Sequence, residues 1–89
     1  MKFTFNNRTY QHFSPRVGDD VAFYRSDDER NYFAAKVTKV LQKDRVHLCV
    51  YAPDGISVRK RVDPLNGDER LKDRWCHIEI AYKIEDDNA

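Results

Sequence analysis

The chain has 89 residues, of which 40% are hydrophobic, 12% aromatic and 35% charged, and this length supports one domain with a single modest core. Sixteen Lys and Arg residues against fifteen Asp and Glu residues leave a formal net charge of +1. The chain therefore lacks the overall positive excess of a dedicated nucleic-acid binder, and any electrostatic partner must be met by a local patch.

The first fourteen residues predict a short β-hairpin. The segments KFTF and RTYQHF flank Asn6-Asn7, a pair that tolerates the positive φ angles of a tight turn. Ser14-Pro15 ends the hairpin, because proline restricts the residue before it and cannot donate to a strand ladder.

Residues 15–83 predict a small β-barrel. In the strand around VAFY, Val21 and Phe23 point one way and Ala22 and Tyr24 the other, and the charged run SDDERN follows as a solvated loop. The next strand, FAAKVTKV, alternates imperfectly, which predicts a β-bulge or a strong bend.

The second half of the barrel begins with the clearest strand, RVHLCVY, in which Val46, Leu48 and Val50 alternate with polar or aromatic neighbours. APDG is a turn, because proline presets φ and glycine accepts positive φ. The alternation of ISVRKRV places Ile56, Val58, Lys60 and Val62 on one face and Ser57, Arg59 and Arg61 on the other. The last strand, RWCHIEIAYKI, sets Cys76, Ile78 and Ile80 against Trp75, His77 and Glu79, and residues 84–89 form a frayed acidic tail.

These elements predict an all-β fold: a small SH3-like barrel of five to seven short antiparallel strands with an N-terminal hairpin. No stretch shows sustained apolar spacing at three and four residues, and closure protects a sheet this small from mispairing at its edges. An OB-fold is the main alternative, weakened by the short chain and by the lack of an obvious helix.

The segments VGDDVAFY, FAAKVTKV, VHLCVYAPDGISV and RWCHIE resemble a pattern of small proteins encoded by tailed bacteriophages and prophages. The resemblance covers residues 17–79, and Cys76, His77 and Ile78 depart from the Trp-His-Trp-Pro-Glu-like ending of that pattern. It implies a phage origin, a small barrel and a bacterial cytoplasm, but no activity. The matching residues are Val17, Gly18, Asp19, Val21, Tyr24, Ala34, Ala35, Val37, Thr38, Val40, Val46, Leu48, Val50, Pro53, Gly55, Trp75 and Glu79.

Cysteine and histidine offer two kinds of site, and neither is predicted here. His47-x-Cys49 and Cys76-His77 could supply zinc ligands, but strand alternation sends Cys76 and His77 to opposite faces and no Cys-x-x-Cys loop is present. A catalytic cysteine needs a positioned base, and an imidazole one residue along the same strand points the wrong way. We therefore expect no metal, no cofactor and no catalytic residues. Two cysteines are also few for a disulfide-dependent secreted domain, so free thiols in a reducing cytoplasm are expected.

The sequence has no continuous apolar run for a signal peptide or a membrane span, so no membrane contact is expected.

A basic segment supports a second class of function, nucleic-acid binding, in which cations hold phosphates while interleaved aromatic rings stack on bases. Acidic residues in the same region lower its net charge. The predicted cations are Arg59, Lys60, Arg61, Arg70, Lys72 and Arg74.

Protein recognition is the favoured function, because tyrosine and tryptophan give contact area at small entropy cost. We expect a non-enzymatic interaction module that binds a bacterial host protein, such as a component of a defence system or another host enzyme. Nucleic-acid binding and small-molecule or nucleotide binding are the alternatives, and both a monomer and a homodimer are compatible with the sequence. The predicted contact residues are Tyr24, Asp27, Asp28, Glu29, Tyr32, Tyr51 and Trp75.

Overall fold

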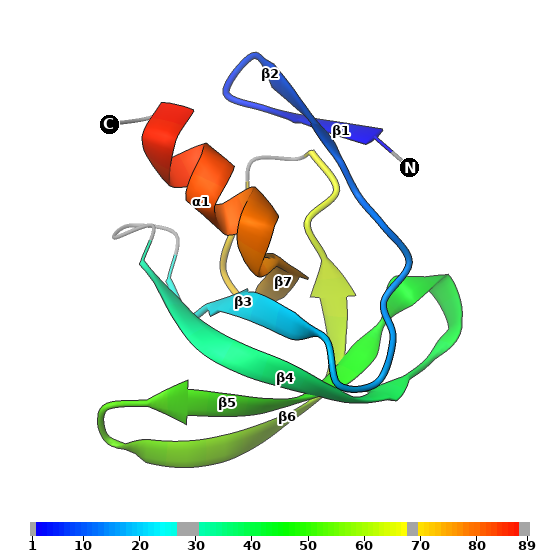
Figure 1. Cartoon of the computed structure of the whole chain (residues 1–89), viewed down its shortest axis with the longest axis vertical. Coiled ribbons are helices and arrows are strands. Elements are labelled where there is room, and N and C mark those ends of the chain that lie inside the picture. The colour runs from blue at the N-terminus through cyan, green and yellow to red at the C-terminus, as the bar shows by residue number, and fades with distance from the viewer. Residues whose placement is uncertain (1, 27–30, 68–69, 88–89) are drawn as a thin grey trace.

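A computed structural model of the chain describes residues 2–26, 31–67 and 70–87 (Figure 1). A two-stranded hairpin and a closed five-strand barrel confirm the predicted small, SH3-like all-β fold. The elements in chain order are β1 (Lys2–Phe5), β2 (Arg8–Gln11), β3 (Asp20–Tyr24), β4 (Tyr32–Val40), the 3-10 turn η1 (Gln42–Asp44), β5 (Val46–Ala52), β6 (Gly55–Pro64), β7 (Arg74–His77) and α1 (Ile78–Asp87).

The hairpin turn is as the sequence predicts. Asn6 and Asn7 both adopt positive φ, at 49° and 64°, so that β1 and β2 pair with Phe3 opposite Tyr10. The rings of Phe3 and Tyr10 lie 5.6 Å apart and face the rest of the molecule. The hairpin therefore contributes an apolar side to the core and does not stand alone.

The barrel order is β3-β4-β5-β6-β7, with β7 also pairing with β3 to close it. Four pairings are antiparallel, but β6 and β7 pair in parallel at Asp63–Arg74 and Pro64–Trp75, which corrects the prediction of antiparallel strands throughout. Two parallel strands cannot be joined by a tight hairpin turn, and residues 65–73 separate β6 from β7 in the sequence.

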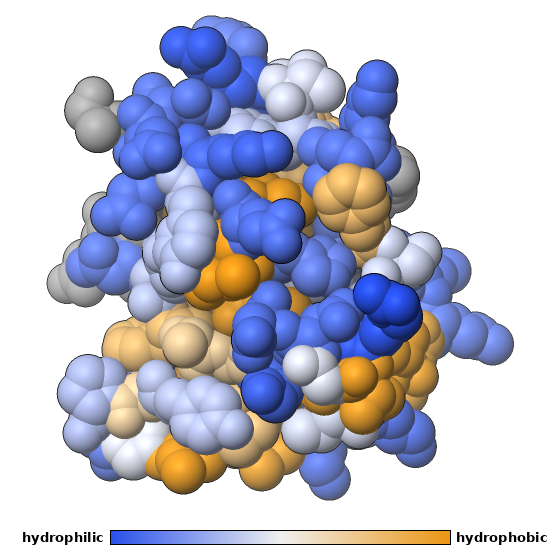
Figure 2. All heavy atoms as spheres, in the orientation of Figure 1, coloured by the Kyte–Doolittle hydropathy of each residue, from blue (hydrophilic) through white to orange (hydrophobic). Residues whose placement is uncertain are grey.

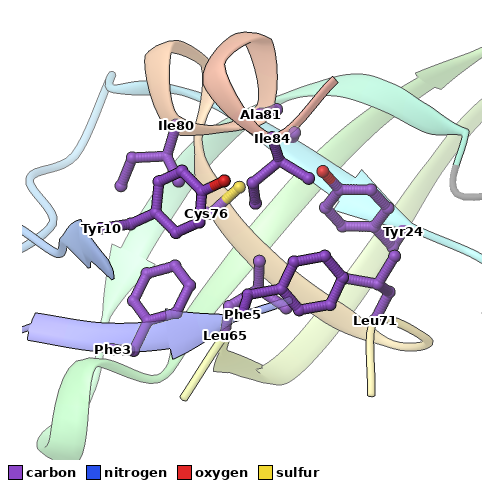
Figure 3. Packing of buried hydrophobic residues seen from close by; sticks show 11 residues of the cluster. Phe3, Phe5, Tyr10, Tyr24, Leu65, Leu71, Cys76, Ile80, Ala81 and Ile84 are labelled. Carbon is purple, nitrogen blue, oxygen red and sulfur yellow. The ribbon is translucent and has the colours of Figure 1, made fainter. Parts of the chain in front are cut away.

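Two cores form because both faces of β3 are buried. Val21 and Phe23 point into the barrel, while Ala22 and Tyr24 point outward under α1 and the hairpin, as the alternation predicts. We call the first cluster the barrel core; its members are Val21, Phe23, Ala35, Val37, Val46, Leu48, Val50, Val62 and Trp75. We call the second the outer core (Figure 3); its members are Phe3, Phe5, Tyr10, Ala22, Tyr24, Leu65, Leu71, Cys76, Ile80, Ala81 and Ile84.

The strand predicted through residue 84 was wrong after His77, since α1 begins at Ile78 and continues through most of the predicted acidic tail. The apolar residues Ile80, Ala81 and Ile84 lie on one side of this helix and are buried in the outer core. Over so short a run, strand and helix periodicities overlap, and the outward-facing side chains of β3 and β7 supply the surface that selects the helix. Residues 88–89 lie outside the described part of the chain.

Two bulges interrupt the barrel strands. The irregular alternation of β4 corresponds to a register shift between Val37 and Lys39, as predicted. A second shift separates Leu48–Arg59 from Val46–Val62 in the β5–β6 pairing, and the prediction that Ile56, Val58, Lys60 and Val62 share a face was therefore wrong. Val62 is buried in the barrel core, whereas Ile56 and Val58 are exposed on the opposite side.

Candidate functional site

Three exposed apolar side chains, Tyr51, Ile56 and Val58, lie together on β5 and β6, on the side of the sheet that also includes β4. Strand pairing aligns Ala34 with Tyr51 and Ile56, and aligns Lys36 with Cys49 and Val58. Because directly paired residues share a face of the sheet, these two cross-strand rows form one continuous surface. We call it the outer sheet face and define it by Ala34, Lys36, Cys49, Tyr51, Ile56 and Val58.

The side chains of this face are unusually accessible for their type. The exposed fractions are 45% for Tyr51, 69% for Ile56 and 64% for Val58, while Cys49 is partly exposed. Figure 2 shows apolar side chains along the lower margin of the molecule, beside the β5–β6 hairpin. Single exposed apolar residues need no explanation, but adjacent ones on a rigid sheet form a surface suited to contact with another molecule.

Charge borders the apolar rows at one side. Lys36 lies 3.5 Å from the carboxylate of Asp20 on β3, and both side chains are at least half exposed. The Arg25 guanidinium lies 3.6 Å from Asp54 and 5.1 Å from the centre of the Phe33 ring. Exposed ion pairs of this kind contribute little to stability and are available to orient a partner.

The predicted protein-binding residues do not come together. Tyr51 lies on the outer sheet face, but Tyr24 and Trp75 are buried and form parts of the two cores, so they cannot contact a partner. The Trp75 indole donates a hydrogen bond to the carbonyl of Asp44 at 3.0 Å, which satisfies its polar atom inside the protein. Tyr32 is half-buried against the outer core and packs edge-on to Tyr24 at 5.8 Å. Asp27, Asp28 and Glu29 lie outside the described residues.

Sequence analysis missed Ile56 and Val58 as surface residues, although a signal for them was present. A two-residue connection at Pro53-Asp54 pairs Ala52 with Gly55, and that register places Ile56 opposite Tyr51. Counting outward from this turn would have placed Ile56 and Val58 beside the non-core side of RVHLCVY. Regular alternation from the core residue Val62 would place Ile56 and Val58 on the core side. The bulge further along β6 breaks that alternation and cannot be read from the sequence.

The predicted basic segment divides into two groups. Arg59, Lys60 and Arg61 lie at the bulge of β6, where β6 passes the end of β3. Arg74 is on β7 and donates to the carbonyl of Pro64 at 3.2 Å. Arg70 and Lys72 are exposed in the connection that precedes β7. The six cations therefore do not form one continuous stripe.

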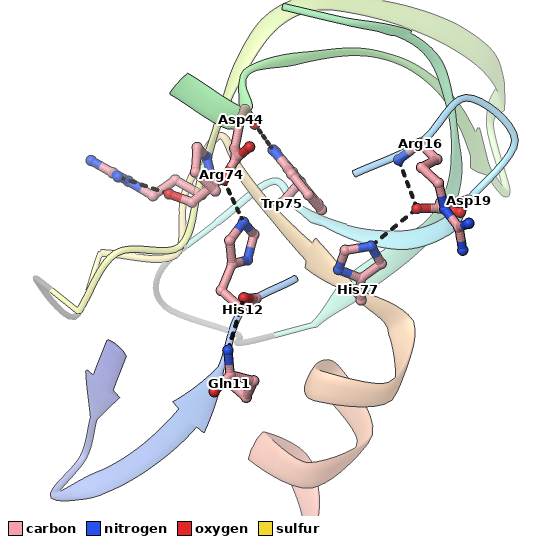
Figure 4. A network of polar contacts seen from close by, with 9 residues as sticks. Gln11, His12, Arg16, Asp19, Asp44, Arg74, Trp75 and His77 are labelled. Atoms are coloured by element: carbon pink, nitrogen blue, oxygen red, sulfur yellow. Dashed lines mark hydrogen bonds and ion pairs between the residues drawn. The ribbon is translucent and has the colours of Figure 1, made fainter. Parts of the chain in front are cut away.

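A polar network joins the hairpin to the barrel (Figure 4). His77 lies 3.2 Å from the Asp19 carboxylate, which also accepts a hydrogen bond from the Arg16 backbone N–H at 2.8 Å. Burial acts to raise the pKa of Asp19, but these two hydrogen bonds outweigh it and hold that pKa below its usual value.

The second histidine of the network, His12, is almost fully buried, and its ring lies tilted by 58° to the Trp75 ring with 5.1 Å between the ring centres. Its Nε2 atom is 3.5 Å from the carboxylate of Asp44. Burial lowers the pKa of His12 against the opposing influence of Asp44, so the neutral imidazole is favoured.

The two thiols lie in different environments. Cys49 lies on the outer sheet face, while Cys76 is buried in the outer core, and the two are unpaired thiols. Burial raises the pKa of Cys76 to about 12, which keeps it a protonated, unreactive thiol at neutral pH. Within residues 2–26, 31–67 and 70–87, no three His, Cys, Asp or Glu side chains are grouped as a metal site would require.

His47 has a structural contact of its own. Its Nδ1 atom accepts a hydrogen bond from the backbone N–H of Arg61 at 3.2 Å. This contact makes Nδ1 the acceptor of the ring and holds the β6 bulge against β5.

Among the described residues, α1 is the one α-helix, and it is too short to cross a membrane.

Comparisons of this chain with protein-family models, with curated proteins and with solved structures find no match. The surfaces described above are therefore the basis for assigning a function.

Proposed function

We propose that this chain is a non-enzymatic protein-interaction module that binds its partner through the outer sheet face. The observation that supports the proposal is the set of neighbouring exposed side chains Tyr51, Ile56 and Val58 on one rigid sheet. Removal of apolar area from water is the main favourable contribution to association, and a sheet holds these side chains in place before binding. Tyr51 adds a rigid aromatic contact with a polar tip.

The proposed partner is a bacterial host protein. The resemblance of residues 17–79 to phage proteins supports this choice, together with a bacterial cytoplasm as the place of action. The face itself favours a partner with a matching apolar patch, because the exposed charges are at its border rather than its centre. Binding through such a patch should persist in high salt.

A pull-down from bacterial lysate treated with nuclease tests this proposal with two matched variants. Tyr51→Ser/Ile56→Ser removes one aromatic and one aliphatic side chain from the outer sheet face. Phe13→Ser/Val17→Ser removes a similar pair, exposed at 56% and 67%, from the connection between the hairpin and β3. We expect the first variant to lose the partner and the second to retain it, at both low and high salt. Equal recovery by both variants would contradict the proposal.

Cys49 provides a direct probe of the same face. A maleimide should modify Cys49 in the free protein and leave Cys76 unmodified as an internal reference, because Cys76 is buried. Addition of the purified partner should slow the modification of Cys49. Analytical ultracentrifugation of the protein alone identifies the competing case, in which a second copy of the chain occupies the face.

A further inference from the structure

The bulge in β6 concentrates positive charge at one point of the barrel wall. Arg59 pairs with Leu48 and Val62 pairs with Val46, so Lys60 and Arg61 together oppose the single residue His47. Arg61 adopts a left-handed φ of 55°, and its N–H is held by His47. A bulge of this kind redirects side chains that regular alternation would send to opposite faces.

The three cations line an open hollow of about 520 Å³ beside the barrel mouth. Phe23 and two valines form its apolar wall, and Asp73 is the one carboxylate on its lining. The Arg59 guanidinium lies over the Phe23 ring at 5.5 Å, which restricts its position before any ligand arrives. The Arg59 Nε atom is buried without a hydrogen-bond acceptor among the described residues.

The charges of this hollow are not neutralised within the described chain. No carboxylate of the described residues forms an ion pair with Arg59, Lys60 or Arg61. The nearby carboxylate of Asp63 is already bound to Arg45, with 2.9 Å between Nε and Oδ1. Three cations and one carboxylate leave a local excess of positive charge in a molecule whose net charge is only +1.

We propose that this hollow, which adjoins the outer sheet face at Val58, is a binding site for phosphate groups. Guanidinium groups present planar, paired donors that match phosphate oxygens, and Lys60 adds a flexible point charge. The apolar wall lowers the local dielectric constant and so strengthens these contacts. The phosphates can belong to a single strand of nucleic acid or to a free nucleotide or phosphate ion, and the binding chemistry is the same.

Fluorescence anisotropy with a labelled oligothymidine of about twelve nucleotides tests the site. The test variant, Lys60→Gln/Arg61→Gln, changes two exposed side chains and leaves Arg59 on Phe23. The control variant, Lys2→Gln/Arg8→Gln, removes the same charge from exposed positions of the hairpin. Loss of two phosphate contacts should make the slope of log affinity against log salt shallower by roughly 1.4 in the test variant, with no such change in the control.

For the wild type, three contacts predict binding roughly twenty-fold weaker at 200 mM than at 50 mM NaCl. Equal losses of affinity in the two variants, or the absence of binding by the wild type both to this oligonucleotide at 50 mM NaCl and to inorganic phosphate, would overturn the proposal. Melting temperatures of both variants establish that the protein remains folded.

Backbone-amide NMR titrations distinguish the two sources of phosphate. Shifts at Arg59–Val62 on addition of inorganic phosphate, absent from the test variant, would show that a free phosphate is enough to occupy the site. Shifts at these amides with the oligonucleotide but not with phosphate would assign the site to a nucleic-acid strand. The absence of shifts with both ligands would overturn the proposal. Since Tyr51→Ser/Ile56→Ser leaves the hollow intact, it should bind phosphate like the wild type, whatever the outcome for the protein partner.

Discussion

One outward-facing row of residues runs across all five barrel strands, from Cys76 through Ala22, Ala34 and Tyr51 to Ile56. Cys76 and Ala22 are completely buried, whereas Tyr51 and Ile56 are 45% and 69% exposed. The side chains differ little in polarity along the row. Burial on the outside of this barrel therefore depends on which segments cover a strand, and not on the alternation of residue types along that strand.

The cover of the β3–β7 side has two parts that contact each other. Helix α1 contributes one apolar side and the hairpin contributes Phe3, Phe5 and Tyr10 (Figure 3). The Tyr10 hydroxyl donates to the Asp87 carboxylate at 2.7 Å and joins the hairpin to the far end of α1. Segments near both ends of the sequence thus form one cover, and within the described residues this cover leaves Tyr51, Ile56 and Val58 exposed.

Removing an apolar side chain from the cover should have the largest effect. Ile80→Ala deletes a buried side chain of α1 from the outer core. We expect the free energy of unfolding to fall by about 2–5 kcal/mol, through lost burial and the cavity left behind. Urea denaturation measures this change, and a fall below about 0.5 kcal/mol would show that the helix does not pack as described.

Acidification should lower the melting temperature through His12, which lies where the hairpin meets the barrel (Figure 4). The pKa of His12 is lowered in the folded protein by burial, so the unfolded chain binds a proton more readily as the pH falls below about 6.5. Neutral His12 therefore contributes fully to the free energy of unfolding above about pH 6.5. This contribution is lost as the pH falls from that value to the lower pKa of His12 in the folded protein. The Asp44 carboxylate acts in the opposite direction but does not outweigh burial. Melting temperatures from pH 7.5 to 5.5 should fall in the wild type.

The variant His12→Leu is the control for this pH dependence, since leucine still places a side chain against Trp75 and cannot be protonated. Its melting temperature should change less over the same range. The Asp19 pKa, which is also lowered, acts in a separate window: its contribution is lost as the pH falls below about 3.8. An identical fall between pH 7.5 and 5.5 in both proteins would exclude His12 as the cause.

A smaller gain should come from the hairpin turn. Asn7 adopts a φ of 64°, a conformation that glycine accepts without steric cost and that favours Asn-Gly turns. We expect Asn7→Gly to raise the free energy of unfolding by about 0.5 kcal/mol, because it stabilises one part of the cover. Thermal denaturation measures the gain. An equal substitution outside the positive-φ region, such as Thr9→Gly in β2, should instead destabilise the protein.

A substitution of Ile56, at the uncovered end of the row, should have the smallest effect on stability. Ile56→Ser removes an apolar side chain that is mostly in water already, so the free energy of unfolding should change by less than about 0.5 kcal/mol. The comparison with Ile80→Ala in the same urea experiment is the most direct test of the difference between the two sides. A loss of 2 kcal/mol or more at Ile56 would mean that this face is covered in solution.

Local elements with a strong pattern over several residues could be predicted from the amino-acid sequence. Asn6-Asn7 predicted the hairpin turn, Val46, Leu48 and Val50 predicted a strand with one buried side, and the irregular run in β4 predicted its bulge. These features depend on the φ angles that each residue type prefers and on the alternation of buried and exposed side chains along a strand. Both are visible over a few neighbouring residues of the sequence.

Contacts between distant segments set three features that the sequence did not predict: the helical conformation of α1, the burial of Tyr24 and Trp75, and the exposure of Ile56 and Val58. Ile78 and Ile80 fit a strand or a helix equally well, and the outward side chains of β3 and β7 favoured the helix. An aromatic residue on a strand has the same local pattern whether a lid covers it or water does. Which of the two occurs is set by contacts between segments far apart in the sequence, and alternation along one strand carries no information about those contacts.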